Sequence, residues 1–436
     1  MGQVSGPQGQ QDRPQSVERS TGEPASALAP FRVRGFRFQW PADLATSWAF
    51  EMETLILGWY VLVETGSVLL LTLFGTLQFI GTLVAPMFGL AGDRLGHRNV
   101  LCAMRAVYAV LAAVLAFLAW IGALGPAAVF VIATLAGLVR PSDLVMRSAL
   151  VGEMMPAGLL MGAMGISRTT ADSARIAGAL AGAGLVATLG IGPAYLMIAA
   201  LYATSLVLTL GVAAAAARSA GAAEAAGRAA PWRDLMSAGA YVWAAPHLLA
   251  AMYLAFLVNL TAFPLTNGLL PYVAKDIYGT DQVGLAFLVA SFAVGALVGS
   301  IWLSRHRGTM RPARMMIGFA AGWYAAILAF AHTESTLAGI AALTVAGFMQ
   351  SLCLVPLSVM LLRCSDPKLR GRVMGLRMLA VYGLPLGLLA SGPLIASLGF
   401  AATSTIAGAI GLACTLLIVW YWRDHLWRAD APANGG

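Results

Sequence analysis

The sequence is poor in charge, since Asp, Glu, Lys and Arg make up 11% of its 436 residues, against roughly 25% in a typical soluble domain. Hydrophobic residues make up 59% of the chain, and its mean hydropathy is +0.79. Such a chain cannot cover itself with polar groups in water, so its main partner is predicted to be the lipid bilayer. The net charge of +8 does not indicate nucleic acid, because the basic residues stand in short clusters between apolar runs.

Motifs for covalent or metal chemistry are also missing. The four cysteines form no C-x-x-C pair, which excludes a disulfide framework and the usual zinc spacings. Neither G-x-x-x-x-G-K-[ST] nor H-E-x-x-H occurs, so nothing supports ATP-driven transport or a membrane-embedded hydrolase. We therefore expect a protein that is not an enzyme and that holds no cofactor and no metal.

What the chain does contain is a series of apolar runs of about 20 residues, the length that crosses a bilayer as a helix. The runs predict an all-α membrane protein with twelve transmembrane helices in two six-helix bundles. They lie near 41–63, 68–91, 99–121, 126–147, 163–187, 192–214, 246–271, 282–303, 315–331, 337–361, 373–396 and 401–421. The corresponding domains are a disordered cytoplasmic tail (1–30), an N-terminal bundle (31–214), a cytoplasmic central loop (215–245), a C-terminal bundle (246–422) and a cytoplasmic tail (423–436).

The loops between these runs differ in charge in a consistent way. One set of alternate loops holds a single firm positive charge, Lys275, whereas the other set is rich in arginine, from Arg94 and Arg98 to Arg423 and Arg428. Loops rich in Lys and Arg stay in the cytoplasm, so both termini are predicted to be cytoplasmic.

An internal repeat supports the division into halves. GALAGAGLVATLG (178–190) aligns without gaps to GLLASGPLIASLG (387–399), with seven identical positions that include Gly190 and Gly399. The two segments fall in spans five and eleven, which are six spans apart. This placement indicates a duplicated six-helix unit.

The loop between spans two and three carries the clearest motif. Its residues Gly89, Asp93, Arg94, Gly96 and Arg98 form the spacing G-x-x-x-D-R-x-G-x-R. This pattern resembles the signature loop of the major facilitator superfamily. The resemblance implies two bundles working by alternating access, with the aspartate helping to latch them at the cytoplasmic side. The simpler interpretation is an ordinary positively charged turn.

Longer segments resemble the enterobactin-exporter-like branch of that superfamily. They are ETGSVLLLTLFGTLQFIGTLVAPMFGLAGDRLGHR (64–98), 138–178, NLTAFPLTNGLLPYVAKDIYG (259–279) and LRGRVMGLRMLAVYGLPLG (369–387). Two departures stand out: Gly178 precedes Ala179 where the branch commonly has Gly-Pro, and the loop after span eight lacks a second signature. The resemblance implies a monomeric protein of the bacterial inner membrane that exports a compound in exchange for protons.

Charges deep in the apolar runs are the candidate coupling residues, since an ionisable group at mid-bilayer costs several kcal/mol and normally faces a cavity or a partner. Glu51 and Glu53 lie in span one, and Asp172 and Arg175 in span five. Residues two apart project about 200° apart on a helix, so one glutamate is predicted to face the cavity and the other a neighbouring helix. A glutamate–Arg175 pair fits proton coupling or a permanent ion pair, and Asp172 is Arg175's candidate partner within the helix.

Span four carries Arg140, Asp143 and Arg147 towards its cytoplasmic end. These residues could guide a polar substrate, or they could brace the following loop. Bracing is the favoured interpretation, with Arg140 as the exception.

Polar groups in span seven are candidates for the substrate cavity. Pro264 and Pro271 free backbone carbonyls and break the helix, which is tolerated where it lines a cavity. Asn259 and Asn267 therefore become candidate contacts with a small-molecule substrate, although hydrogen bonding between helices explains them equally well. Weaker candidates are Gln78 and Gln350.

Together these features predict a secondary active transporter. The resemblance implies that it exports a small amphipathic or hydrophobic compound, such as a siderophore or drug, in exchange for protons. One alternative is a proton-coupled importer of an organic acid that uses Arg140 or Arg175. A second is a membrane protein that senses a ligand or scaffolds a partner without transport.

Overall fold

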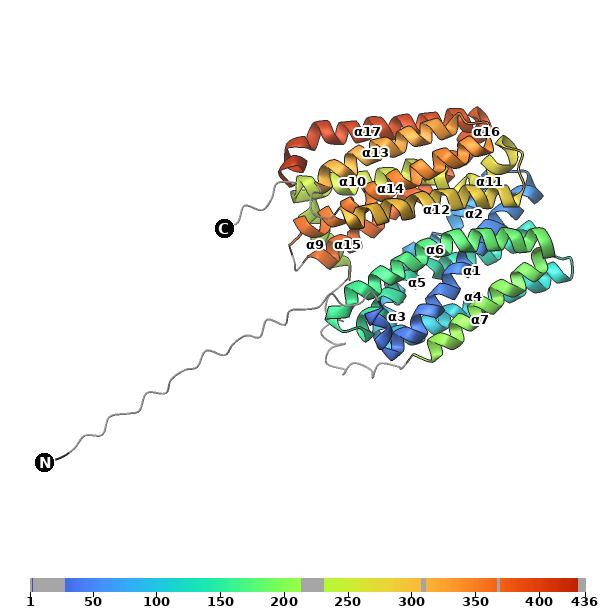
Figure 1. Ribbon diagram of the computed structural model, residues 1–436, viewed down its shortest axis with the longest axis horizontal. Helices are drawn as coiled ribbons and strands as arrows, with labels where there is room; N and C mark the ends of the chain where they lie inside the picture. Colours follow the sequence, from blue (N-terminus) through green and yellow to red (C-terminus); the bar gives the residue numbers. More distant parts are fainter. Residues whose placement is uncertain (1, 3–27, 213–230, 307–310, 367–368, 430–436) are drawn as a thin grey trace.

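The computed structural model describes residues 2, 28–212, 231–306, 311–366 and 369–429, and within these ranges the regular structure is entirely helical. Two bundles, one from each half of the chain, lie one above the other in Figure 1. The first half comprises η1 (Ala29–Arg32), α1 (Arg34–Thr65), α2 (Val68–Leu77), η2 (Ile80–Val84), α3 (Ala85–Leu95), α4 (His97–Trp120), α5 (Pro126–Met154), α6 (Ala157–Leu189) and α7 (Ile191–Leu210). The second comprises α9 (Pro231–Ala244), α10 (Pro246–Thr261), η3 (Pro264–Gly268), α11 (Leu270–Tyr272), η4 (Val273–Ile277), α12 (Gln282–Arg305), α13 (Pro312–Ala331), α14 (Thr336–Cys364), α15 (Arg370–Leu379), η5 (Ala380–Tyr382), α16 (Gly383–Leu398) and α17 (Phe400–Ala429).

Each of the twelve predicted spans coincides with one of these helices or with a helix in several pieces. Within the described ranges, nine spans are long and apolar enough to cross a membrane by composition alone. The other three are α1, the α2–η2–α3 span and α6. In α1 and α6 buried charges lower the hydropathy, whereas the second span is divided by η2.

Two boundaries differ from the prediction. Residues 231–244, expected within a loop, form α9, which packs on α15 and α10. Helix α17 continues to Ala429, past the predicted boundary at residue 422. In both places polar residues end the apolar run without ending the helix. Residues 215–230 and nearly all of the predicted N-terminal tail lie outside the described residues.

The predicted repeat has a structural counterpart at the ends of α6 and α16. Gly190 and Gly399 adopt left-handed φ values of +85° and +82°. The amide of each donates a hydrogen bond of 2.9 Å to the carbonyl four residues earlier, Val186 and Ile395 respectively. Only glycine adopts this conformation without strain, so the same residue ends the fifth span of both halves.

Span seven is broken where its prolines predicted. The α-helix of α10 ends at Thr261, and π-helical turns follow at Pro264–Gly268 and Val273–Ile277. Proline lacks the amide that would continue the helical ladder. As a result the backbone around Asn267 is irregular.

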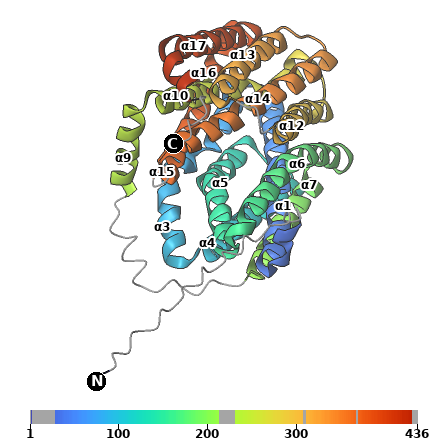
Figure 2. The same cartoon turned by 60° about the vertical axis from the view of Figure 1, so that its left-hand side comes forward.

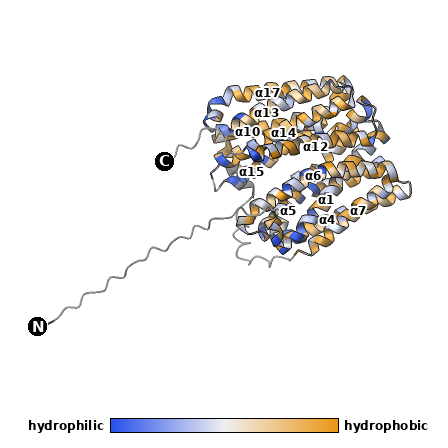
Figure 3. Ribbon diagram, in the orientation of Figure 1, coloured by the Kyte–Doolittle hydropathy of each residue, from blue (hydrophilic) through white to orange (hydrophobic). Residues whose placement is uncertain are grey.

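The start of α1, the end of α17 and the described parts of the basic loops lie at one end of the molecule, which we call the arginine-rich end; it is on the left in Figure 1. Figure 3 shows hydrophobic residues along the helices and hydrophilic ones at this end and within the first half. The halves pack through α6 against α12, α2 against α16 and α1 against α11. By contrast, the main contacts of α3 are with η2, α4 and α5, and those of α15 are with α9, η5 and α14, within the same half in each case. Figure 2 shows α15 above α3.

Side chains join the halves at the end opposite the arginine-rich end. Lys275 Nζ donates a hydrogen bond of 3.3 Å to the carbonyl of Leu62 at this end, and Thr76 Oγ1 donates one of 3.4 Å to that of Pro385 nearer the cavity. The space between the halves is therefore closed towards this end.

Candidate functional site

A cavity of about 160 Å³ lies between the two halves, lined by α1, α2, α6, α11, α12, α16 and the broken part of span seven. Most of its lining is apolar, including Phe74 and Leu388. The polar lining residues are Glu51, Thr54, Gln78, Arg175 and Asn267. A few polar groups within an apolar wall are typical of a small-molecule site.

The charged residues of this cavity form a pair across α1 and α6. Arg175 Nε lies 3.6 Å from Glu51 Oε1. The pair forms because the helices approach closely at Gly178, where an added Cβ would stand 2.9 Å from the Cβ of Glu51. Glu51 remains 29% exposed and Arg175 32% exposed, so both groups are accessible from the cavity.

Glu53 points away from the cavity into the first bundle. It is 5% exposed, its Oε2 lies 2.9 Å from Arg140 Nη2, and it accepts a hydrogen bond of 2.8 Å from Tyr202 Oη. Arg140 also donates hydrogen bonds to Thr54 and Gln78. These two residues line the cavity, so the buried pair is connected to the cavity wall by one layer of hydrogen bonds.

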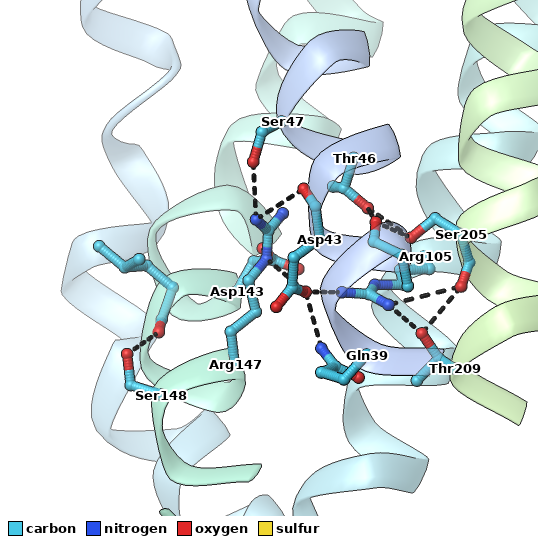
Figure 4. Close-up of polar contacts among 12 residues, drawn as sticks. Gln39, Asp43, Thr46, Ser47, Arg105, Asp143, Arg147, Ser148, Ser205 and Thr209 are labelled. Atoms are coloured by element: carbon cyan, nitrogen blue, oxygen red, sulfur yellow. Dashed lines mark hydrogen bonds and ion pairs between the residues drawn. The ribbon is translucent and has the colours of Figure 1, made fainter. Parts of the chain in front are cut away.

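A second buried polar network lies nearer the arginine-rich end of the first bundle (Figure 4). Asp43 of α1 is paired with Arg105 of α4 and with Arg147 of α5, the latter at 3.6 Å, and Arg147 is also paired with Asp143. Gln39 donates a further hydrogen bond to Asp43, and Arg147 donates one to Ser47. Arg105 donates to the hydroxyl of Thr209 and to the carbonyl of Ser205. The negative charges of the two carboxylates balance the positive charges of the two guanidiniums. The ion pairs and hydrogen bonds of this network together join α1, α4, α5 and α7.

Several of these residues were not candidates from the sequence. Asp43 and Arg105 lie inside apolar runs and could have been found by the same criterion that selected Glu51. Tyr202 carried no comparable signal, because a tyrosine in an apolar helix is common. Its role depends on the packing of α7 against α1.

The other predicted residues are distributed as follows. Asp172 is paired with Arg168 at 3.2 Å rather than with Arg175. Asn259 donates a hydrogen bond to the carbonyl of Ala255 in its own helix, and Gln350 is buried on α14. Neither Asn259 nor Gln350 is among the residues that line the cavity, whereas Asn267 and Gln78 are.

In the signature loop, Gly96 turns the chain between α3 and α4 with a φ of +85°. Arg98 donates hydrogen bonds to the last carbonyls of α7, at 3.4 Å to Thr209 and 2.5 Å to Leu210. Cations favour this end of a helix. Arg94 is exposed, and the side-chain environments of Gly89 and Asp93 lie outside what the structure describes.

These observations define a helical multi-pass membrane protein whose two bundles enclose a cavity. The family model described as Major Facilitator Superfamily matches residues 44–386, and the chain belongs to that superfamily. It is therefore a membrane transporter of this type.

Solved structures give the same fold. A POT family transporter in complex with 5-aminolevulinic acid is 15% identical, with a TM-score of 0.68 over 90% of this chain and 96% of that one. The nucleoside transporter NupG is 16% identical, with a TM-score of 0.65 over 90% and 98%. A peptide transporter POT mutant in complex with sulfate is 14% identical, with a TM-score of 0.70 over 91% and 95%. Among curated proteins, no sequence match was found.

Proposed function

We propose that this protein is a proton-coupled exporter of a small amphipathic or hydrophobic compound, working by alternating access as a monomer. The observation that carries the proposal is the Glu51–Arg175 pair, which stands on the wall of a cavity shared by both halves. An ionisable pair at mid-membrane normally serves a substrate or ion pathway.

We assign the arginine-rich end to the cytoplasm by the positive-inside rule, and with it both termini, in a bacterial inner membrane. The hydrogen bond of Lys275 to Leu62 then joins the halves on the outer side of the cavity, and that of Thr76 joins them beside it. On this assignment the conformation faces inward. Loading from the cytoplasm and release outside would require these contacts to break.

The exposure of Glu51 supports proton coupling. When a proton binds Glu51, its charge is lost and Arg175 is left without its counter-ion. When the proton leaves, the ion pair forms again and α1 is held against α6. The substrate and the proton thus compete for binding between α1 and α6. Exchange of substrate for protons requires such competition.

Export is supported by the segments that resemble the enterobactin-exporter-like branch. The apolar lining supports an amphipathic cargo over a sugar, which would need more hydrogen-bonding groups. The signature-loop latch of Gly89, Asp93, Arg94, Gly96 and Arg98 remains part of the proposal.

The test is proton movement in proteoliposomes with an imposed pH gradient, reported by a pH-sensitive dye. The added compounds are lipophilic cations (ethidium, tetraphenylphosphonium) and aromatic acids (salicylate, 2-naphthoate). We expect at least one compound to dissipate the gradient through the wild-type protein, and Glu51→Gln to abolish this effect. Glu334→Gln, which removes an exposed carboxylate between α13 and α14, should behave as wild type. Coupled flux that survives Glu51→Gln would contradict the proposal.

A further inference from the structure

Gln78 stands between the cavity and the buried Glu53–Arg140 pair. It directly follows α2, and its side chain lines both the cavity and a small void of about 10 Å³ beside Glu53 and Arg140. Its Oε1 accepts hydrogen bonds from Arg140 Nη1 and, at 3.2 Å, from Thr54 Oγ1. Its oxygen is therefore engaged on the side of the buried pair.

The orientation of the Gln78 amide is determined by these two neighbours. A guanidinium nitrogen carries hydrogens and cannot accept a hydrogen bond. The Thr54 hydroxyl accepts a hydrogen bond of 2.9 Å from Arg140 and directs its own hydrogen to Gln78. Both neighbours present hydrogens to the same atom of Gln78. That atom must be the carbonyl oxygen, because an NH2 group in its place would set hydrogens against hydrogens.

The NH2 group of Gln78 is consequently a hydrogen-bond donor that remains for the cavity. Its Nε2 makes no hydrogen bond within the part of the chain that the structure describes, and it is not among the polar atoms enclosed there without a partner. Asn267, the amide on the wall of the other half, is less constrained, because it contacts the flexible hydroxyl of the adjacent Thr266, at 3.3 Å. A fixed donor on a mostly apolar wall selects ligands, since a ligand without an acceptor leaves it unpaired.

We propose that Gln78 donates a hydrogen bond to a carbonyl oxygen of the substrate. The substrate is then an amphipathic carbonyl compound, a class that includes ketones, amides, esters and aromatic acids. Its apolar part packs against Phe74 and Leu388 of the cavity wall. This inference rests on the proposed transport function and names the class of its cargo.

The experiment compares two probes of the same shape, 2-acetylnaphthalene and 2-isopropenylnaphthalene, which differ in having a carbonyl oxygen or a methylene group. Binding of each tritiated probe to the full chain in dodecyl maltoside micelles is measured by equilibrium dialysis against empty micelles. Gln78→Glu keeps an oxygen for Arg140 and Thr54 but replaces the NH2 group by a second acceptor. It should weaken ketone binding about fivefold, as for loss of one neutral hydrogen bond, and leave alkene binding unchanged. Gln78→Met removes the amide and should give the same loss.

A second readout is the infrared carbonyl stretch of the ¹³C-labelled ketone, which moves to lower frequency when the oxygen accepts a hydrogen bond. The bound ketone should show this shift in the wild-type protein and lose it in Gln78→Glu. The matched control is Gln350→Met, which removes a buried glutamine of α14 that does not line the cavity. This variant should bind both probes as the wild type does.

The inference would be overturned by wild-type protein that binds neither probe at millimolar concentration, or by ketone binding that is unchanged in both Gln78 variants. Equal weakening of ketone and alkene, or a carbonyl stretch that Gln78→Glu does not move, would also contradict it, because the effect would then be structural. Any of these results alongside coupled flux that depends on Glu51 would reject the donor role and leave the transporter intact. Ketone binding that depends on Gln78 in a protein without coupled flux would support the site and reject the proposed transport.

Discussion

At the scale of single residues, Glu51 and Glu53 show how two positions on one helix acquire different chemistry. The half-turn between them places Glu51 on the cavity wall beside Arg175 and Glu53 in the bundle between Arg140 and Tyr202. Glu51 stays accessible to ions, whereas Glu53 is held by a buried guanidinium and a buried hydroxyl. A carboxylate that must exchange protons requires the first environment, and one that joins three helices requires the second.

This difference predicts the effect of neutralising Glu53. Glu53→Gln leaves Arg140 as an uncompensated buried charge, a change that costs about 3 kcal/mol in comparable cases. We expect a clear fall in the unfolding temperature in detergent. The double variant Glu53→Gln/Arg140→Met removes both charges and should recover much of the loss.

Glu51→Gln is the matched control for this measurement, since its side chain is partly exposed and such pairs contribute little to stability. An equal fall in unfolding temperature for Glu51→Gln and Glu53→Gln would show that the two environments are not distinct.

At the scale of elements, the sequence predicted the helices well and their partners only in part. Apolar runs located all twelve spans, and the prolines located the break in span seven, because both signals are local. The charges inside spans one and five also predicted a pair between a glutamate and Arg175, without deciding between Glu51 and Glu53. The network of Asp43 with Arg105 was missed because it joins spans one and three. Likewise Asp172 was assigned to Arg175, although Arg168 lies within reach one turn earlier. Hydropathy carries no information on which side chains meet.

The close approach of α1 and α6 predicts a specific sensitivity at Gly178. Gly178→Val would place side-chain atoms against the Trp48 carbonyl and the Glu51 Cβ, which lie 3.1 and 2.9 Å from an added Cβ. We expect a loss of about 1–3 kcal/mol in stability from overpacking, together with reduced proton-coupled flux, because Glu51 and Arg175 are forced apart.

Gly184→Ala on the same helix is the control, since nothing lies within 4 Å of an added Cβ there. It should change stability by less than about 0.5 kcal/mol and leave proton-coupled flux intact. If Gly184→Ala were as damaging as Gly178→Val, a general intolerance of α6 to added side chains, and not the α1–α6 contact, would be the cause.

At the scale of the whole molecule, the contacts within the first bundle differ in kind from the contacts between the two halves. Buried ion pairs join the helices of the first bundle to one another. The halves meet through α2 against α16, with the Thr76 hydrogen bond and the close contact of Gly392 with Thr72. Rigid bundles joined by weak contacts can move against each other as units. This arrangement supports the rocking motion that the proposed alternating-access cycle requires.

The last prediction tests this motion by fixing the α2–α16 contact. In a chain whose four cysteines are replaced by alanine, Thr72→Cys and Gly392→Cys would place two thiols within reach of a disulfide. Oxidation should abolish proton-coupled flux in proteoliposomes, because the outer contact can no longer open, and a reductant should restore it. A disulfide between Ser300→Cys and Ser351→Cys joins α12 to α14 within the second half, where the hydroxyls lie 2.8 Å apart, and should leave flux unchanged. Full flux through the oxidised Thr72→Cys/Gly392→Cys protein would mean that α2 and α16 stay together throughout the cycle, and the assignment of this contact as the outer gate would then be wrong.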